Sequence, residues 1–334
     1  MTQTSNLSPN AQAVLLLCGQ GGAGGVPPLT PGIYNKLAFW LKERVLEPAH
    51  LMEAEALALY EREPLPEVPA DRLRALMGQG LGVALLVEEW QRQGGWVLCR
   101  ADGAYPGRLR EVLKLNAPLL LYGIGPVEIL SQPGIAVVGS RNLDEAGRQF
   151  AQRLGEACAQ RELAVFTGGA RGADEAAAEA VLESGGRAGL LLAGDLGRTA
   201  LKKSWRIRLG QGVATLCSLT PPGARFSVGA AMGRNRAIYA LSQATVVVAS
   251  DLQTGGTWEG ATENLRRWHV PVFVRDVPRP AGNQALIAKG ALPFPSRALE
   301  DPRQLLEAAQ PPAHGRPAEV VAAPQQLGLF GATE

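Results

Sequence analysis

The feature that most constrains this chain is an alternation of short apolar runs with helical segments between residues 135 and 274. Runs of four or five apolar residues have the length of β-strands. Strands that are apolar at every position are covered on both faces. When such strands alternate with helices, they predict an α/β fold with a parallel, doubly wound sheet. The expected strands are IAVVG, LAVFTG, GLLLAG, VATLCSL, ATVVVAS and VPVFV.

Composition divides the chain into three parts. Residues 1–95 show helical patterning after a glycine- and proline-rich opening, so we expect a small helical domain whose first thirty or so residues are flexible. Residues 96–297 hold the expected sheet, with two further strands at 96–100 and 119–123. Residues 298–334 mix proline, alanine and glutamine without periodicity, which predicts a flexible tail.

Positive charge is concentrated in one segment, although the formal net charge of the chain is only +2. Residues 187–236 contain nine basic residues and the single acid Asp195. A cluster of this kind indicates a polyanionic partner such as nucleic acid.

Cysteine and histidine usage argues against a metal centre and against a disulfide framework. The four cysteines lie far apart without paired spacing, and there are three histidines. Zinc sites and disulfide scaffolds need more closely spaced ligands, so we expect buried thiols, no metal and no cofactor. No basic signal start is evident, and no apolar run approaches the ~20 residues of a membrane span, so we expect a soluble, cytoplasmic protein.

Three glycine-rich turns follow strands of the expected sheet. GSRN at 139–142, TGGARGAD at 167–174 and TGGT at 254–257 each stand at the carboxyl end of a strand, where ligands bind in sheets of this kind. Glycine lets backbone N–H groups approach a phosphate, and a following helix adds partial positive charge. Two of the turns carry Arg141 and Arg171. The three turns together predict an anion-binding rim, and the alternative is that their glycines serve ordinary turns. The sequence after the first strand matches neither the dinucleotide-binding fingerprint nor a Walker loop.

Two further segments contain clustered cations. In MGRNRAIYALS, Arg234 and Arg236 stand where we expect a helix to begin, which is unfavourable for cations unless an anion binds there. In KKSWRIR, cations surround a tryptophan, and a basic groove with aromatic rings is typical of nonspecific single-strand binding. The alternatives are solvated arginines and a tryptophan that anchors its helix to the core. The candidates for DNA contact in the second segment are Lys202, Lys203, Trp205 and Arg206.

The order and spacing of five motifs resemble the DNA-processing protein A family (DprA, also called Smf). The motifs are GWVLCRADGAYPGRLREV, AVVGSRN, TGGARGAD, GRNRAIYALS and GNQALIAKGA. The resemblance implies an extended Rossmann-like domain with a mainly parallel sheet, preceded by a small helical domain. The resemblance further implies a homodimer that binds single-stranded DNA without sequence preference and protects it. Such a protein is not an enzyme, and it loads a RecA-type recombinase in transformation or recombination. The implied DNA-contacting residues are Gly139, Ser140, Arg141, Gly169, Arg171, Gly172, Asp174, Arg234, Asn235 and Arg236.

One loop departs from that family and supplies a rival hypothesis. TGGTWEGA begins at residue 254, where relatives carry an SGSL-type loop. It partly resembles the PGGxGTxxE motif of cytokinin-activating phosphoribohydrolases, which makes Glu259 a candidate catalytic carboxylate. An enzyme acting on nucleoside monophosphates and a nucleotide-signal sensor are therefore alternatives. As a structural residue, Glu259 would favour the dipole of a helix N-terminus.

A short motif near the end of the sequence predicts a further partner. QLGLF at 326–330 resembles the peptide by which bacterial proteins dock on the replicative sliding clamp. An otherwise polar tail can bury two large apolar side chains in a pocket of its partner. The candidates for clamp contact are Gln326, Leu327, Leu329 and Phe330.

Overall fold

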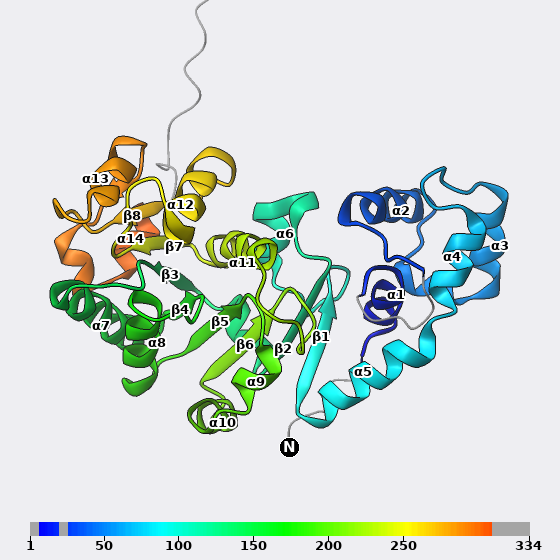
Figure 1. Ribbon diagram of the computed structural model, residues 1–334, viewed down its shortest axis with the longest axis horizontal. Coiled ribbons are helices and arrows are strands. Elements are labelled where there is room, and N and C mark those ends of the chain that lie inside the picture. The colour runs from blue at the N-terminus through cyan, green and yellow to red at the C-terminus, as the bar shows by residue number, and fades with distance from the viewer. Residues whose placement is uncertain (1–6, 20–25, 309–334) are drawn as a thin grey trace, which may run out of the picture.

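A nine-stranded sheet forms the centre of the molecule (Figure 1). The computed structural model describes residues 7–19 and 26–308. The strand order is β1-β2-β6-β5-β4-β3-β7-β8-β9, and all pairs from β6 to β9 are parallel. β1 and β2 are antiparallel to each other, and β2 is antiparallel to β6. The strands are β1 (Gly95–Cys99), β2 (Leu120–Ile124), β3 (Gly134–Val138), β4 (Ala164–Thr167), β5 (Ala188–Leu192), β6 (Ala214–Ser218), β7 (Ala244–Val247), β8 (Val272–Val274) and β9 (Leu292–Pro293).

This architecture confirms the predicted doubly wound, mainly parallel sheet. Each of the eight expected strands is present, and each is buried at nearly every position. β9 was not predicted, because two residues containing a proline carry no strand signal.

Helices cover both faces of the sheet. Leu154 on α7 and Val181 on α8 belong to the apolar cluster on one face, together with Val137 of β3. Ile238 on α11 and Ala136 of β3 belong to the cluster on the other face. The helices of the first face include α7 (Glu145–Gln160), α8 (Ala173–Glu183), α9 (Leu196–Ala200) and α10 (Lys203–Gly210), and those of the second are α6 (Gly107–Leu113), α11 (Val228–Leu241), α12 (Gly255–Arg267) and α13 (Ala281–Ala288). Short 3-10 helices are η1 (Pro48–Met52), η2 (Lys114–Asn116), η3 (Val127–Ser131) and η4 (Ser296–Leu299).

The N-terminal part is helical, as expected, and one of its helices lies within the stretch that we expected to be flexible. The helices are α1 (Pro9–Cys18), α2 (Pro31–Glu43), α3 (Ala54–Arg62), α4 (Ala70–Met77) and α5 (Gly80–Arg92). α1 lies within the stretch predicted to be flexible, yet Ala11, Val14 and Leu17 are buried. A helix that is apolar around most of its circumference packs into a core, and α1 shares its apolar cluster with residues of β1 and β2.

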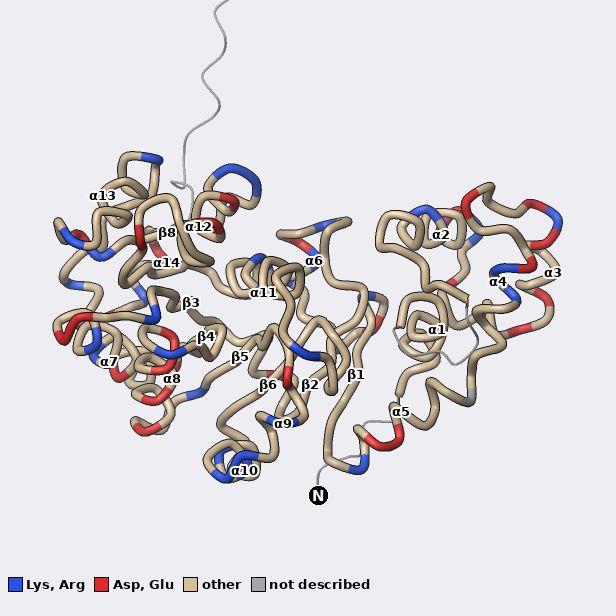
Figure 2. The backbone as a smooth tube through the Cα atoms, in the orientation of Figure 1, with Lys and Arg blue, Asp and Glu red and all other residues tan. Residues whose placement is uncertain are grey.

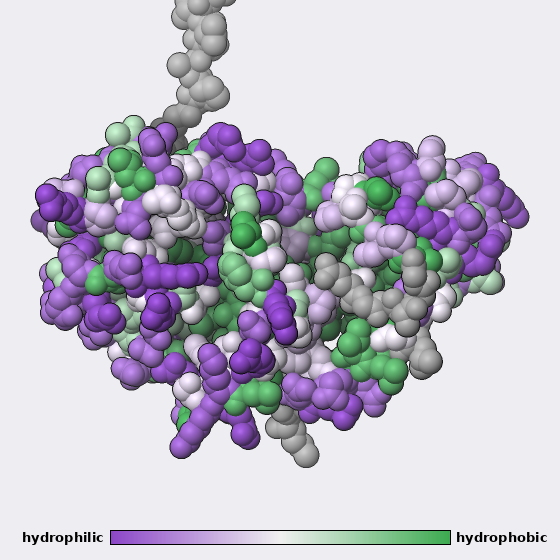
Figure 3. Space-filling view, viewed as in Figure 1, coloured by the Kyte–Doolittle hydropathy of each residue, from purple (hydrophilic) through white to green (hydrophobic). Residues whose placement is uncertain are grey.

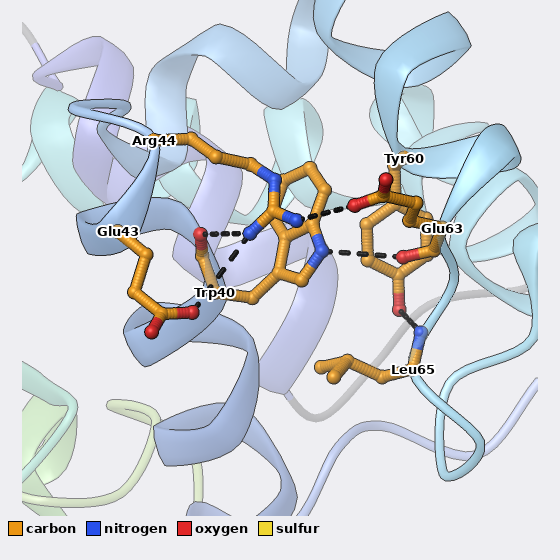
Figure 4. Close-up of polar contacts among 6 residues, drawn as sticks. All are labelled: Trp40, Glu43, Arg44, Tyr60, Glu63 and Leu65. Atoms are coloured by element: carbon orange, nitrogen blue, oxygen red, sulfur yellow. Dashed lines mark hydrogen bonds and ion pairs between the residues drawn. The ribbon is translucent and has the colours of Figure 1, made fainter.

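Aromatic packing holds the helices of this domain together (Figure 4). The rings of Trp40 and Tyr60 meet edge to face, with centroids 4.9 Å apart. The Arg44 guanidinium lies 4.2 Å from the Trp40 ring centroid and also forms a 2.6 Å ion pair with Glu63. The Trp40 Nε1–H donates to the Glu63 carbonyl, and the Tyr60 hydroxyl accepts from the Leu65 N–H. These contacts tie α2 to α3 and the turn after it.

The beginning of the predicted tail is also structured. α14 (Arg303–Ala308) follows η4, and its Leu305 side chain is fully buried in the core. The first residues of the tail predicted at 298–334 are therefore helical and packed. The motif of Gln326, Leu327, Leu329 and Phe330 lies outside the described residues. Within the described ranges, no helix is both long and apolar enough to span a bilayer.

Candidate functional site

A cavity of about 500 Å³ opens at the carboxyl edge of the parallel strands. The loop after β3, the start of α8, one side of α11 and the start of α12 line it. Parallel strands bring their carboxyl ends to one edge, and this is where doubly wound sheets bind ligands. Of the predicted DNA-contacting residues, the cavity is lined by Gly139, Ser140, Arg141, Asp174, Arg234 and Asn235.

The Arg234 guanidinium lies beside the Asp174 carboxyl at the buried end of the cavity. Asp174 is 5% exposed, and its Oδ2 accepts the Gly168 N–H at 3.0 Å. Burial raises the pKa of Asp174, and the nearby Arg234 charge opposes that rise. Burial likewise lowers the pKa of Arg234, opposed by Asp174. The two groups therefore stabilise each other's charged forms without forming a direct ion pair.

Gly168 makes room for that guanidinium. A Cβ at Gly168 would overlap Nη1 of Arg234. The only hydrogen bond of Arg234 within the described part of the chain is a long one, 3.5 Å from Nη1 to the Leu191 carbonyl. Its Nε is buried and has no partner. The side chain is held by sterics and charge, with a donor left unused.

The other glycines of the predicted rim allow loops of the protein to approach each other. Gly172 has φ +91°, and a Cβ there would overlap the Ser140 carbonyl oxygen. A Cβ at Gly139 would lie 2.6 Å from that of Ala173, and one at Gly169 would lie 3.1 Å from Leu190 Cδ2. We predicted that these glycines give a phosphate access to the backbone. In the structure, their immediate role is to let neighbouring segments of this chain pack closely against one another.

Arg141 and Arg171 are both exposed, but only Arg141 lines the cavity. Within the described residues, neither guanidinium makes an ion pair or a hydrogen bond. Ser140 beside Arg141 has a local role, because its Oγ accepts the Asn142 N–H at 3.2 Å. Arg171 lies in the turn before α8, outside the cavity lining. Both charges are available to a ligand, one at the cavity and one beside it.

Arg236 is separated from Arg234, although the sequence motif contains both. Its Nε lies 3.2 Å from Glu263 Oε2, and that carboxylate also contacts Arg267. Arg236 lines a neighbouring concavity of about 720 Å³. Positions two apart on a helix lie about 200° apart around its axis, so the two arginines cannot share the first cavity. Asn235 lies between them and donates to the Gly256 carbonyl at 3.2 Å.

The predicted DNA contacts of the KKSWRIR segment lie outside both concavities. Figure 2 shows the basic residues gathered at α10, and α10 packs on the face opposite α11 and α12. Lys202, Lys203 and Arg206 are exposed, whereas Trp205 is half-buried against the core with Arg208 over its ring at 5.2 Å. Trp205 thus takes the anchoring role that we weighed as its alternative.

The start of α12 forms the remaining wall. Thr254 is its N-cap residue and makes no side-chain capping bond. Glu259, in the second turn, is exposed and lines the cavity together with Asp251. The rival catalytic candidate therefore shares a cavity with Arg141 and Arg234. The described residues contain no cluster of side chains suited to hold a metal ion.

The sequence model of the DNA recombination-mediator protein A family matches residues 96–307, which include every residue of the cavity. The chain belongs to this family. The DNA processing protein DprA of Mycobacterium tuberculosis is 35% identical over 144 residues, 42% of this chain and 37% of that protein. DprA of Streptococcus pneumoniae is 30% identical over 171 residues, 49% of this chain and 58% of that protein. The aligned stretches thus cover between a third and three fifths of those relatives.

Solved structures of the family share the fold. The crystal structure of DprA from Streptococcus pneumoniae superposes with a TM-score of 0.66, at 22% identity, over 86% of this chain and 95% of that chain. The Helicobacter pylori DprA structure, described by its single-stranded DNA binding mode, superposes with a TM-score of 0.50, at 22% identity, over 59% and 89% of the two chains. At this identity the likeness establishes the extended Rossmann-like fold.

Sequence reasoning missed several residues of the cavity of this DprA-family chain. Phe226, Val228 and Met232 line it and are 56%, 72% and 43% exposed. Tyr239, only 2% exposed, also lines it. The pair Arg225-Phe226, in the loop between β6 and α11, was an available signal, since a cation beside an aromatic residue in a loop is typical of single-strand binding. Tyr239 gave no signal, because its spacing on α11 is that of a core residue.

Proposed function

We propose that this DprA-family protein binds single-stranded DNA, without sequence preference, across the carboxyl edge of its sheet. The observation that carries the proposal is the meeting of Arg141, Arg234 and an exposed Phe226 at one cavity. Nonspecific single-strand binding needs cations along the backbone and apolar rings against the bases. The family and the printed description of the Helicobacter pylori relative support the same ligand.

The exposed cations outside the cavity extend this surface. Arg171 lies beside the cavity, and Lys202 and Lys203 follow α9. Two backbone hydrogen bonds tie α9 and the residue before it to the loop that carries Phe226: Asp195 N–H to the Ala224 carbonyl at 2.7 Å and Gly197 N–H to the Pro222 carbonyl at 3.0 Å. A strand leaving the cavity past Phe226 would therefore meet these lysines, which contact phosphates whatever the base sequence.

The role that follows is stoichiometric: the protein holds and protects the strand and passes it to a RecA-type recombinase, in transformation or recombination. We further propose that it acts as a homodimer in the cytoplasm and is recruited to the sliding clamp by Gln326, Leu327, Leu329 and Phe330. Deleting residues 325–334 should abolish clamp pull-down and leave DNA affinity unchanged. An undiminished pull-down would refute the clamp proposal alone.

A second candidate function is hydrolysis of nucleoside monophosphates, because Glu259 lines the same cavity as two arginines. Glu259→Gln separates the two candidates. If the protein is a binding protein, its affinity for DNA should change by less than about threefold, since the exposed carboxylate is an acceptor and not a cation. If it is a phosphoribohydrolase, wild-type protein should release free base from nucleoside monophosphates and Glu259→Gln should not.

The main test is the salt dependence of DNA binding. Each phosphate contact on a single strand contributes about 0.7 to the slope of log affinity against log salt concentration. Arg141→Gln should lower that slope by about 0.7, and Lys202→Gln with Lys203→Gln by about 1.4, measured by fluorescence anisotropy of a labelled oligonucleotide. Lys42→Gln with Arg62→Gln is the matched control, since both residues are exposed on the helical domain. Slopes as unchanged in the site variants as in the control would refute the proposed surface.

A further inference from the structure

Three basic side chains meet where the helical domain joins the sheet. Arg100 follows β1, Arg110 lies on α6, and Lys114 begins η2. The Arg110 Nη1–H donates to the Arg100 carbonyl at 3.3 Å, and the Arg100 Nη1–H donates to the Leu115 carbonyl at 3.4 Å. Among the residues that the structure describes, none of these three cations forms an ion pair with an acid. Like charges repel each other, so an unneutralised cluster of this kind indicates an anionic ligand.

Two large apolar side chains are exposed beside these cations. Phe39 on α2 is 63% exposed, and Leu115 on η2 is 68% exposed. The Asn35 Nδ2–H donates to the Leu115 carbonyl at 3.0 Å, which ties α2 to η2. Phe39 follows Asn35 by one helical turn, so the two lie on the same face of α2. Figure 3 shows hydrophobic surface at the hollow between the sheet and the helical domain.

We call this group the junction surface: Phe39, Arg100, Arg110, Lys114 and Leu115. Cations that contact phosphates, combined with apolar side chains on which bases pack, are typical of proteins that bind single strands without sequence preference. An exposed aromatic ring among unpaired cations is therefore better suited to a nucleic-acid strand than to a small anion.

The junction surface lies at the same edge of the sheet as the cavity. β2 is antiparallel to β6, so the start of β2 lies at the carboxyl edge of the parallel strands. Lys114 and Leu115 come shortly before that start, and the Arg100 N–H donates to the Leu119 carbonyl directly before it. The order β3-β4-β5-β6-β2-β1 gives five strand spacings along this edge, or about 24 Å at ~4.8 Å each. Phe226 follows β6 and therefore stands between the cavity and the junction surface.

From this arrangement we propose that the junction surface is a second contact for the bound single strand. This inference rests on the proposed single-strand binding and adds a role for the helical domain. The strand leaves the cavity, passes Phe226 and Lys202, and continues along the carboxyl edge across β6, β2 and β1. Its phosphates then contact the three cations of the junction surface, and one base packs on the Phe39 ring beside Leu115. An acidic peptide of a protein partner would have matching charge, but the alignment with the cavity along one sheet edge favours the strand.

The test compares two thymidine strands of different length. A strand of about four nucleotides spans ~14 Å at the ~3.4 Å per nucleotide of a stacked strand, which is too short to join the cavity to the junction surface. A strand of about twenty nucleotides reaches both. Phe39→Ala with Leu115→Ala should weaken binding of the long strand at least about fivefold, as the loss of one stacked base predicts, and leave the short strand unchanged. Leu85→Ala with Leu86→Ala is the matched control, since both side chains are exposed on α5, which leads to the opposite end of β1.

Salt dependence gives a second, independent readout. Lys114→Gln should lower the salt slope for the long strand by about 0.7 and leave the slope for the short strand unchanged. Arg187→Gln is its control, because Arg187 is exposed directly before β5, at the amino edge of the sheet.

Three outcomes would overturn the inference. The first is unchanged affinity of Phe39→Ala with Leu115→Ala for the long strand, and the second is equal weakening of both strands. The third is a glutamate-rich peptide that binds wild-type protein but not this variant, while the long strand binds both proteins equally. In each case Arg141→Gln would still weaken both strands if the proposed function holds. If Arg141→Gln weakens neither strand, the proposed function itself is refuted.

Discussion

Replacing Gly168 by alanine should move Arg234 without changing the charge of the protein. The added methyl group would overlap Nη1 of Arg234, which is the free end of a flexible side chain and can turn away. The backbone of Gly168 is not in the left-handed region, so alanine is accepted there. Within the described residues Arg234 loses one hydrogen bond, a 3.5 Å contact with Leu191, and it also leaves the buried Asp174 carboxyl without the charge that offsets its burial. Removing one partner of a buried charge pair is strongly destabilising, so the free energy of unfolding should fall by about 3 kcal/mol.

The effect on DNA binding is measured on the folded variant, at a temperature below its unfolding transition. A hydrogen bond from a charged donor contributes about 1.5–3 kcal/mol, which corresponds to roughly a 10- to 150-fold loss of affinity. Anisotropy titration of a labelled oligonucleotide measures the affinity, and a urea melt measures the stability. Gly103→Ala is the control, because a Cβ at Gly103 meets no atom within 4 Å. A Gly168→Ala protein with wild-type affinity would refute the assignment of Arg234 to the bound strand.

Three further predictions concern Arg236, Asn283 and the four thiols. Arg236→Gln should change DNA affinity by less than about threefold, because Arg236 is paired with Glu263 outside the cavity. A loss of affinity comparable to that of Arg234→Gln, in the same titration, would contradict the exclusion of Arg236 from the DNA contacts. Asn283→Ala should lower the free energy of unfolding by about 2–4 kcal/mol in a urea melt, since the buried amide pairs with Ser250, Val248 and Arg275 backbone groups, whereas Gln284→Ala should have little effect. The thiols should resist alkylation at pH 8 until the protein unfolds, because burial raises the pKa of Cys18, Cys99 and Cys217 to about 12 and raises that of Cys158 as well, so that little thiolate exists at pH 8. Rapid labelling of Cys99, Cys158 or Cys217 in the folded protein would refute their burial.

The sheet could be predicted from the sequence because its signal is local. Runs such as IAVV and VVVA are apolar at every position, and short runs of this kind between helices are typical of strands covered on both faces. The first two turns of α11 were not predicted, because VGAAMG contains two glycines and small residues that read equally well as a loop. α1 was missed for a similar reason, since a glycine-rich segment follows its apolar run.

The candidate site could be predicted only in part, because cavities are assembled from segments distant in sequence. Arg141 and Arg234 were identified from their motifs and lie at one cavity. Helix geometry excludes Arg236 from it, which the spacing of the motif could have revealed. The loop position of Phe226 and the unpaired hydroxyl of Tyr239 depend on long-range packing, and no local pattern encodes either.

Photo-crosslinking of a single strand that carries 5-iodouracil, followed by peptide mapping, locates the bound strand on the protein. We expect cross-links within residues 219–239, with the exposed Phe226 as the favoured aromatic acceptor, and their loss in Arg141→Gln with Arg234→Gln. Cross-links confined to the helical domain at 31–92, or to α10, would contradict it.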